Sequence, residues 1–333
     1  ILETARSVAV IKADQFLDRG ALTLDDTLNY TSGVVGDTFG FSTRGDFPLV
    51  RGLNVPEYLD NIQVLFGFYN NARSDVYTLE QVEVLKGPAS VLFGQGSPGG
   101  ILNTVSKKAS QDYTGGEIVA DYGTFDRKQI AADIGFALSD TVSARLVTVF
   151  RDSDTQVDFV DDDALVIMPS ITYEDENTQL TLLVNYTDRD SDSAHQFLPL
   201  SVTGCASNDV TISEASVCST TTGREVDEGL YVGDPGFNRY DSKSLSFTFF
   251  GVQEFNDVFS FETTARYRDN DADYRQTWIS FLGAGNPRTL PDGTAAARTW
   301  YDAPASSEQF AIDSRLRARF ETGAVDHEVL AGV

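Results

Sequence analysis

The sequence predicts a two-part fold, with an N-terminal α+β unit over residues 1–110 and an antiparallel transmembrane β-barrel that residues 111–333 build only in part. Apolar and polar residues alternate with period two throughout the second part, which indicates strands. The alternating segments exceed the 5–6 residues typical of soluble strands and approach the roughly 9–11 of a tilted transmembrane strand. Short and long connections also alternate, as in outer-membrane barrels.

The strands of the second part follow from this alternation. In segment 259–268, Phe259, Phe261 and Tyr267 share one face, and Arg266 and Arg268 share the other. Similar patterns occupy 141–151, 245–249 and 310–321. Short turns are expected at 139–140, 175–177, 256–257 and 322–326, and long links at 153–163, 189–242 and 271–306.

We count about nine strands from Glu117, and the last ends at Val333. A sheet that spans a membrane must close so that every backbone N–H and C=O is paired, and bacterial barrels have even strand numbers. The chain is therefore expected to be the front part of a larger protein. A secreted β-sandwich would explain the alternation equally well, but not the order of short and long loops.

Charge and composition separate the two parts and exclude several classes. The 333 residues carry a formal charge of −25, of which −3 falls in 1–110 and −22 in 111–333. The acidic balance argues against nucleic acid, and no apolar run is long enough for a helical span. A signal peptide is absent or already removed before Ile1. Two His and two Cys make a His/Cys metal site improbable.

The N-terminal unit reads as a small mixed globule. A helix is expected over Leu22–Tyr30. Short strands are expected over 47–53, 57–64, 82–86 and 101–105, joined by Gly-rich links. These strands are too short to span a membrane.

Several blocks in this unit resemble, in order, the plug of TonB-dependent outer-membrane receptors of the siderophore-receptor branch. The blocks are DTLNYTSGV at 26–34, VRGL at 50–53, EYLDN at 57–61 and the long run from YTLEQVEVLKGP to the lysine at 107. The segment HEVLAG at 327–332 resembles a recurrent barrel strand of the family. Lys86, Ser32 and Asn61 depart from the frequent Arg, Pro and Gly. No TonB box is visible upstream of the plug, so this peptide is missing here or was cut off before Ile1.

The resemblance implies that residues 1–110 stopper a barrel of about 22 strands in the outer membrane of a Gram-negative bacterium. It further implies a monomeric receptor that imports a ferric siderophore by coupling to TonB and contacts outer-membrane lipid and lipopolysaccharide. No catalysis, metal site or cofactor is expected, and iron enters only as chelated cargo.

The resemblance also suggests ligand contacts at the apex of the plug. Arg51 is a candidate contact, with a structural role as the alternative. The aromatic loop Phe66-Gly67-Phe68-Tyr69, with Tyr77 beside it, would form a platform for the apolar face of a chelate, or pack in the core.

A second set is expected to hold the plug together. It comprises Arg51, Gly52, Glu80, Glu83, Lys86, Gly87, Pro88, Gly94, Pro98, Gly99 and Gly100. The charged members would form an internal set of salt bridges, or the plug cations would pair with barrel carboxylates. The glycines at 94–99 match the pattern of a dinucleotide loop, but Pro98 and the following apolar run predict a turn and then a strand.

Other motifs have weaker functional interpretations. Cys205 and Cys218 lie in the longest loop and are expected to form a disulfide outside the inner membrane, with free thiols as the alternative. Four aspartate groups lack the pattern of an EF-hand and are interpreted as solvated rim acids, with bridging of divalent cations to lipopolysaccharide as the alternative. His195 and His327 have no local partner pattern for catalysis.

The charge of the second part bears on the cargo. A net charge of −22 repels highly anionic ligands at low salt, which favours a neutral or cationic hydroxamate chelate over a tri-anionic catecholate. Importers of cobalamin, oligosaccharide or another chelate, a passive porin, and a soluble β-rich adhesin or enzyme remain as alternatives.

Overall fold

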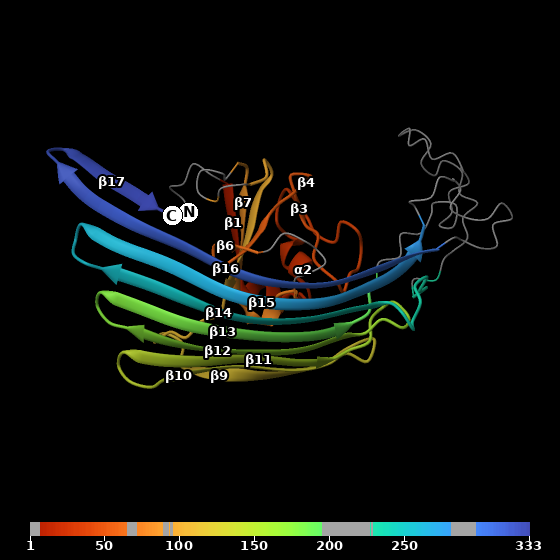
Figure 1. Cartoon of the computed structure of the whole chain (residues 1–333). Coiled ribbons are helices and arrows are strands. Elements are labelled where there is room, and N and C mark those ends of the chain that lie inside the picture. The colour runs from red at the N-terminus through yellow and green to blue at the C-terminus, as the bar shows by residue number, and fades with distance from the viewer. Residues whose placement is uncertain are drawn as a thin grey trace.

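The computed structural model describes residues 7–64, 72–88, 93, 96–194, 227, 229–280 and 298–333. A long, curved sheet forms the floor of the molecule, and the N-terminal unit lies against its concave face (Figure 1). None of the helices in these ranges is long and apolar enough to cross a membrane.

A five-stranded sheet, in the order β1-β7-β8-β5-β6, is the centre of the N-terminal unit. Its strands are β1 (Ser7–Lys12), β5 (Glu57–Leu59), β6 (Ile62–Gln63), β7 (Leu79–Lys86) and β8 (Gly100–Ser106), and only the β5 and β8 pair is parallel. Around it lie α1 (Ala13–Asp18), α2 (Leu24–Leu28), the 3-10 turn η1 (Val76–Thr78), and the small sheet of β2 (Val34–Val35), β3 (Leu49–Val50) and β4 (Leu53–Asn54). Apolar side chains fill its core, among them Phe16, Leu28, Val50, Val82 and Val84.

The predicted helix over Leu22–Tyr30 is confirmed in shorter form as α2, because its N-terminus is capped at Thr23. The Thr23 hydroxyl accepts the Asp26 N–H at 3.1 Å, and the Asp26 carboxylate accepts the N–H groups of Leu22 and Thr23. This reciprocal capping satisfies donors that the first helical turn leaves open.

Two of the strands predicted for this unit are wrong in detail, because each is a hairpin. The segment 47–53 splits into β3 and β4 at Arg51 and Gly52, where φ is +54° and +75°. The segment 57–64 splits into β5 and β6 at Asp60 and Asn61, where φ is +52° and +65°. A left-handed backbone ends a strand, and apolar alternation does not report it. The strands predicted at 82–86 and 101–105 are confirmed within β7 and β8.

The curved sheet contains nine consecutive antiparallel strands in the described residues, as predicted. They are β9 (Gly115–Tyr122), β10 (Lys128–Ala137), β11 (Val142–Asp152), β12 (Asp162–Glu174), β13 (Thr178–Ser191), β14 (Arg239–Glu254), β15 (Phe259–Ile279), β16 (Arg298–Thr322) and β17 (Val325–Gly332). The short turns lie at one end of the sheet, at the left in Figure 1, and the longer connections lie at the other.

The predicted long link at 271–306 is wrong over much of its length. β15 continues to Ile279 and β16 already begins at Arg298. The continuous apolar band of the outer face ends at the cross-strand pair Tyr267 and Phe310. Mostly charged or small residues follow on that face as far as Trp300. The strands therefore continue past the apolar band, where alternation no longer marks them.

The two faces of the sheet have opposite chemistry. Large apolar side chains are exposed on the convex face, including Ile118, Phe136, Phe150, Leu182 and Ile312. The concave face carries buried polar residues, including Ser143, Thr172, Thr248 and Asn270. A soluble sheet buries its apolar face, whereas here that face is directed away from the N-terminal unit.

Candidate functional site

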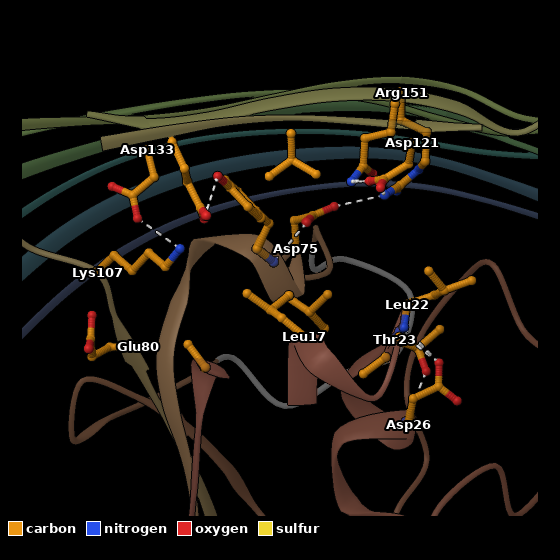
Figure 2. Close-up of a pocket in the computed structure, with 18 of the residues that line it drawn as sticks. Leu17, Leu22, Thr23, Asp26, Asp75, Glu80, Lys107, Asp121, Asp133 and Arg151 are labelled. Atoms are coloured by element: carbon orange, nitrogen blue, oxygen red, sulfur yellow. Dashed lines mark hydrogen bonds and ion pairs between the residues drawn. The ribbon is translucent and has the colours of Figure 1, made fainter. Parts of the chain in front are cut away.

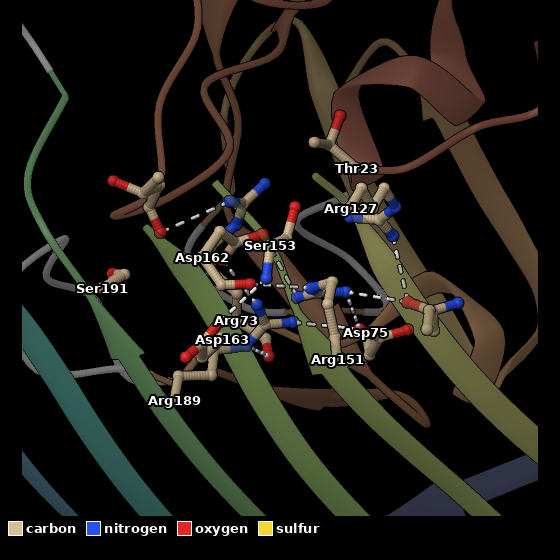
Figure 3. A network of polar contacts seen from close by, with 12 residues as sticks. Thr23, Arg73, Asp75, Arg127, Arg151, Ser153, Asp162, Asp163, Arg189 and Ser191 are labelled. Atoms are coloured by element: carbon tan, nitrogen blue, oxygen red, sulfur yellow. Dashed lines mark hydrogen bonds and ion pairs between the residues drawn. The ribbon is translucent and has the colours of Figure 1, made fainter. Parts of the chain in front are cut away.

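Buried ion pairs join the N-terminal unit to the concave face of the sheet, and the largest group surrounds Asp75 (Figure 3). Asp75 precedes η1, and its carboxylate accepts the Tyr77 N–H at 3.1 Å. The same carboxylate lies 2.9 Å from Arg151 on β11 and 3.3 Å from Arg189 on β13. Asp75 thus caps a turn of the unit and binds two strands of the sheet.

Other carboxylates complete this group. Asp162, at the start of β12, lies 3.2 Å from Arg151 and 3.4 Å from Arg189. Within the N-terminal unit, Arg73 forms a bidentate pair with Asp46, the shorter distance being 2.7 Å. Each buried cation near Asp75 therefore faces at least one carboxylate, as burial requires.

The geometry fixes the charge of Asp75. Burial alone would raise the pKa of the Asp75 carboxyl, but the charges of Arg151 and Arg189 hold that pKa below its usual value. The carboxylate is therefore ionised at neutral pH. Removing one partner of such a buried pair costs about 3–5 kcal/mol, because an uncompensated charge remains.

A second group lies nearer the middle of β10 and β11 (Figure 2). Lys107, which follows β8, lies 2.9 Å from Asp133 of β10, and its ammonium lies 4.2 Å from the centre of the Tyr77 ring. Arg145 holds Asp133 through two contacts of 2.7 Å, and Glu80 lies 3.6 Å from Arg145.

A third contact reaches the far side of the sheet. Arg266 of β15 lies 2.6 Å from Asp60 and donates to the Leu59 carbonyl at 2.8 Å. Asp60 also accepts the Ser106 N–H at 2.8 Å. The left-handed turn at Asp60 thus directs one carboxylate to both β8 and the sheet.

A cavity of about 1690 Å³ lies between the N-terminal unit and the sheet (Figure 2). Residues of α1 and of the segment after β8 line one side, and residues of β9, β10 and β11 line the other. Tyr77 crosses to the sheet here, and its hydroxyl donates to Glu117 of β9 at 3.1 Å. Burial, and then the neighbouring Glu117, raise the pKa of the Tyr77 phenol, so it keeps its proton at neutral pH.

The predicted ligand contacts fall in different places. Arg51 is exposed at the β3 to β4 turn, and its side chain extends toward Gly33 and Gly87. Tyr77 is buried against the sheet and lines the cavity. Phe66, Gly67, Phe68 and Tyr69 lie outside the described residues, as do Gly94 of the structural set and the predicted disulfide partners Cys205 and Cys218.

The charged members of the predicted structural set do not pair with one another in the described structure. Lys86 donates to the Ser32 hydroxyl at 3.2 Å, and Glu83 accepts from Asn103 at 2.9 Å. Glu80 contacts Arg145 of the sheet. The expected ion pairs between the two parts joined plug cations to sheet carboxylates, but most of those observed have the opposite polarity. Asp60, Asp75 and Glu80 of the N-terminal unit contact arginines of the sheet. Among these contacts, only Lys107 brings a plug cation to a sheet carboxylate.

The uncharged members of that set that the structure describes lie around one turn. Pro88 is exposed just after β7 and Gly52 lies beside Arg51, while Pro98 and Gly99 form a turn closed by the Gly100 N–H to the Ser97 carbonyl at 3.1 Å. This turn leads directly into β8, so the turn and strand predicted here, in place of a dinucleotide loop, are confirmed. A Cβ on Gly100 would overlap the Leu85 carbonyl, and φ is +136° there, so close approach explains the glycine.

The sequence analysis missed Asp60, Asp75, Arg151 and Arg189 as functional residues. One available signal was an arginine on a strand face whose other side chains are small and polar. A buried arginine there needs a carboxylate from another part of the chain. Within the described ranges, no group of three or more His, Cys, Asp or Glu residues could hold a metal ion.

Comparisons with known proteins agree with this architecture. Residues 1–101 match the family model of the TonB-dependent Receptor Plug Domain. The whole chain is 30% identical to the ferrioxamine receptor of Yersinia enterocolitica and 26% identical to the ferrichrome outer membrane transporter/phage receptor of Escherichia coli K12. It covers 44% and 45% of their lengths, so the chain spans less than half of these relatives.

A solved structure shows the same fold. The open form of the ferric-catecholate import receptor Fiu from Escherichia coli K12 superposes with a TM-score of 0.82 at 24% identity, over 99% of this chain and 48% of that one. The predicted fold class is therefore confirmed as a plug and part of an antiparallel barrel sheet. Residues 1–101 are therefore identified as a TonB-dependent receptor plug domain, and the chain as a whole is similar to the siderophore-receptor branch of the TonB-dependent outer-membrane receptors.

Proposed function

We propose that the protein to which this chain belongs imports a ferric siderophore across the outer membrane by coupling to TonB, and that it favours a hydroxamate-type chelate. The observation that carries the proposal is the position of the plug, held on the concave polar face of the sheet by the buried pairs around Asp75, Asp133 and Asp60. A plug fastened by ion pairs closes the barrel and can still shift.

The mechanism follows from this architecture. The chelate binds between the outer loops and the plug, and TonB pulls on a segment that precedes the plug. Force on the plug exchanges its buried ion pairs for hydrated ones, so the plug moves relative to β9–β15 and the chelate passes. No bond of the cargo is made or broken, which agrees with a transporter and not an enzyme.

Two observations support the choice of cargo. The segment 111–333 has a net charge of −22, which disfavours a tri-anionic chelate at low salt. The relatives named for ferrioxamine and ferrichrome support a hydroxamate, because both chelates hold iron through hydroxamate groups. Fiu, a catecholate siderophore receptor that is also 26% identical to this chain, supports the alternative.

Uptake by whole cells tests the proposal. The full-length protein is expressed in an outer-membrane receptor-deficient Gram-negative strain under iron limitation, with and without TonB. We expect uptake of radioactive iron from ferrioxamine B only when TonB is present, and little uptake from a tri-anionic catecholate. Preferential catecholate uptake would overturn the hydroxamate preference, and uptake of cobalamin or an oligosaccharide without iron transport would overturn the cargo class.

We also propose a monomer in contact with outer-membrane lipid and lipopolysaccharide. The apolar convex face, where Ile118, Phe150 and Ile312 are exposed, supports lipid contact. Fractionation of the full-length protein into outer membranes, and its extraction only by detergent, would be the expected result.

A further inference from the structure

The cavity between plug and sheet extends along the length of the strands. Its lining includes Phe125 and Gln156, in the connections at one end of the sheet, and Gln179 and Phe250, toward the end with the short turns. With about 1690 Å³ it exceeds the roughly 300–1,000 Å³ of pockets that hold small molecules. It therefore has the extent of a passage and not only of a binding pocket.

The lining of this cavity is strongly acidic. It contains twelve carboxylate side chains, from Asp and Glu, and six cationic ones, from Lys and Arg. Four of the cations, Arg73, Lys107, Arg145 and Arg151, are already paired with buried carboxylates. Unpaired negative charge in a confined space attracts cations and repels anions more strongly than it does in open water.

Several contacts between plug and sheet span the cavity and would have to open before a large solute passed, among them Asp75 with Arg151 and Glu80 with Arg145. The Tyr77 hydroxyl donates to Glu117 of β9, and the Lys107 ammonium pairs with Asp133 of β10. Both plug residues flank the central plug sheet, since Tyr77 lies just before β7 and Lys107 just after β8. Movement of these two strands therefore acts on both contacts together.

We propose that cargo crosses on this side, between α1 with η1 of the plug and β9–β11 of the sheet, and that the acidic lining makes the passage selective for neutral or cationic chelates. The inference rests on the proposed import function. It adds the path that the chelate takes and a second step, after binding, at which chelates are selected by charge. Selection by the passage acts on translocation and leaves binding at the outer loops unchanged.

β9 offers a matched pair of positions for testing the route. Val119 lines the cavity, whereas its neighbour Ile118 is exposed on the convex face. A tryptophan at 119 adds bulk inside the proposed passage, and a tryptophan at 118 adds the same bulk on the opposite face. Neither position belongs to an ion pair between plug and sheet in the described structure.

The experiment measures binding and uptake of radioactive ferrioxamine B separately, in cells that express the full-length protein. Val119→Trp should retain binding and lower uptake by about tenfold, which corresponds to a barrier increase of about 1.4 kcal/mol. Ile118→Trp should retain both. Wild-type uptake by Val119→Trp, at equal surface binding, would overturn the route.

A second experiment tests the charge selection. Ferrioxamine B carries a free ammonium group, and acylation of that group with succinate replaces it by a carboxylate without changing the iron ligands. Wild-type protein should transport the cationic form faster at equal occupancy. The double variant Glu117→Gln and Asp121→Asn, on the cavity face of β9, should narrow this preference by about threefold.

Asp257→Asn is the control for the loss of a negative charge as such, because Asp257 lies in an exposed turn and does not line the cavity. An unchanged preference in the double variant, or an equal change in the control, would overturn the selection by the lining. Failure of the wild-type protein to transport either chelate would instead overturn the proposed function, so the two failures are distinguishable.

Discussion

The plug and the sheet place their apolar residues on opposite sides. In the plug, Leu28, Val82 and Val84 are completely buried in a core. In the sheet, residues of the same type, such as Leu182, are exposed on the convex face, and the concave face carries serine, threonine and arginine around an apolar cluster that includes Val147 and Met168. The plug therefore buries its apolar side chains in its own core. The sheet instead exposes apolar side chains on its convex face and presents polar side chains to the plug.

This difference explains why the two parts need each other. Arg151, Arg189 and Arg266 project from the concave face, where each is buried by the plug. Buried cations are costly unless they are paired, and the plug supplies Asp75 and Asp60. The interface thus combines buried ion pairs with an apolar cluster of Tyr77, Val147 and Met168, whereas the interior of the plug is held by apolar packing.

Removal of Asp75, the central carboxylate of the interface, is expected to have the largest effect on the association of plug and sheet. Asp75→Ala leaves Arg151 and Arg189 with only Asp162 nearby, and should lower the stability of the plug in its seat by about 3–5 kcal/mol. Urea-dependent proteolysis of the detergent-solubilised protein measures this loss. Asp257→Ala, in an exposed turn, should behave as wild type. Equal stability of the two variants would contradict a charge-held interface.

A leucine in each part sharpens the comparison. Leu28→Ala removes a fully buried side chain from the plug core and should destabilise the plug by about 2–5 kcal/mol. Leu182→Ala, at a position that is 45% exposed on the convex face, should cost clearly less because no enclosed cavity forms. Thermal unfolding followed by plug-specific proteolysis measures both. A larger effect at Leu182 would mean that this face is packed against protein.

A charge on the convex face tests its proposed contact with lipid. Leu182→Arg should destabilise folding into lipid by about 2–4 kcal/mol, as expected near the middle of a bilayer. Phe255→Arg, in the short turn after β14, should cost about 0–1 kcal/mol, as expected near an interface. Equilibrium unfolding from phospholipid vesicles is the measurement. An unfolding free energy that Leu182→Arg leaves unchanged would mean that this face contacts water and not lipid.

The smallest expected effect concerns a carboxyl inside the plug. Burial, and then the charge of Asp46, raise the pKa of Asp25 to about 7, although its Oδ2 accepts the Phe47 N–H at 2.8 Å. The folded state therefore holds a proton that the unfolded state releases near pH 4. This contribution to stability is complete at low pH and is lost as pH rises from about 4 to about 7.

Asp25→Asn should remove that part of the pH dependence. Unfolding free energies of the plug between pH 4 and pH 8 test this, with Asp14→Asn, an exposed change on α1, as the control for a lost charge. If the unfolding free energy of Asp25→Asn depended on pH as steeply as that of the wild type, another group would cause the pH dependence.

Much of this architecture could be predicted from the sequence, for reasons that are local. Period-two alternation placed the strands around 141–151, 259–268 and 310–321, because adjacent strand residues point to opposite faces. The same rule failed beyond Tyr267, where aspartates replace the apolar residues of the outer face, and at Arg51 and Asp60, where a left-handed backbone breaks an apolar run. Local signals of both breaks were present, because Gly52 follows Arg51, and Asp60 and Asn61 are of the types that adopt a left-handed backbone most readily.

The sequence by itself determined the strands, the division of charge and the family resemblance, since these depend on neighbouring residues and on motifs. Only the tertiary structure decided which charges meet, because Asp75 and Arg189 are 114 positions apart and Asp60 and Arg266 are 206 apart. Arginine on a polar strand face shows that a partner is needed. The curvature of the sheet and the seat of the plug determine which carboxylate supplies it.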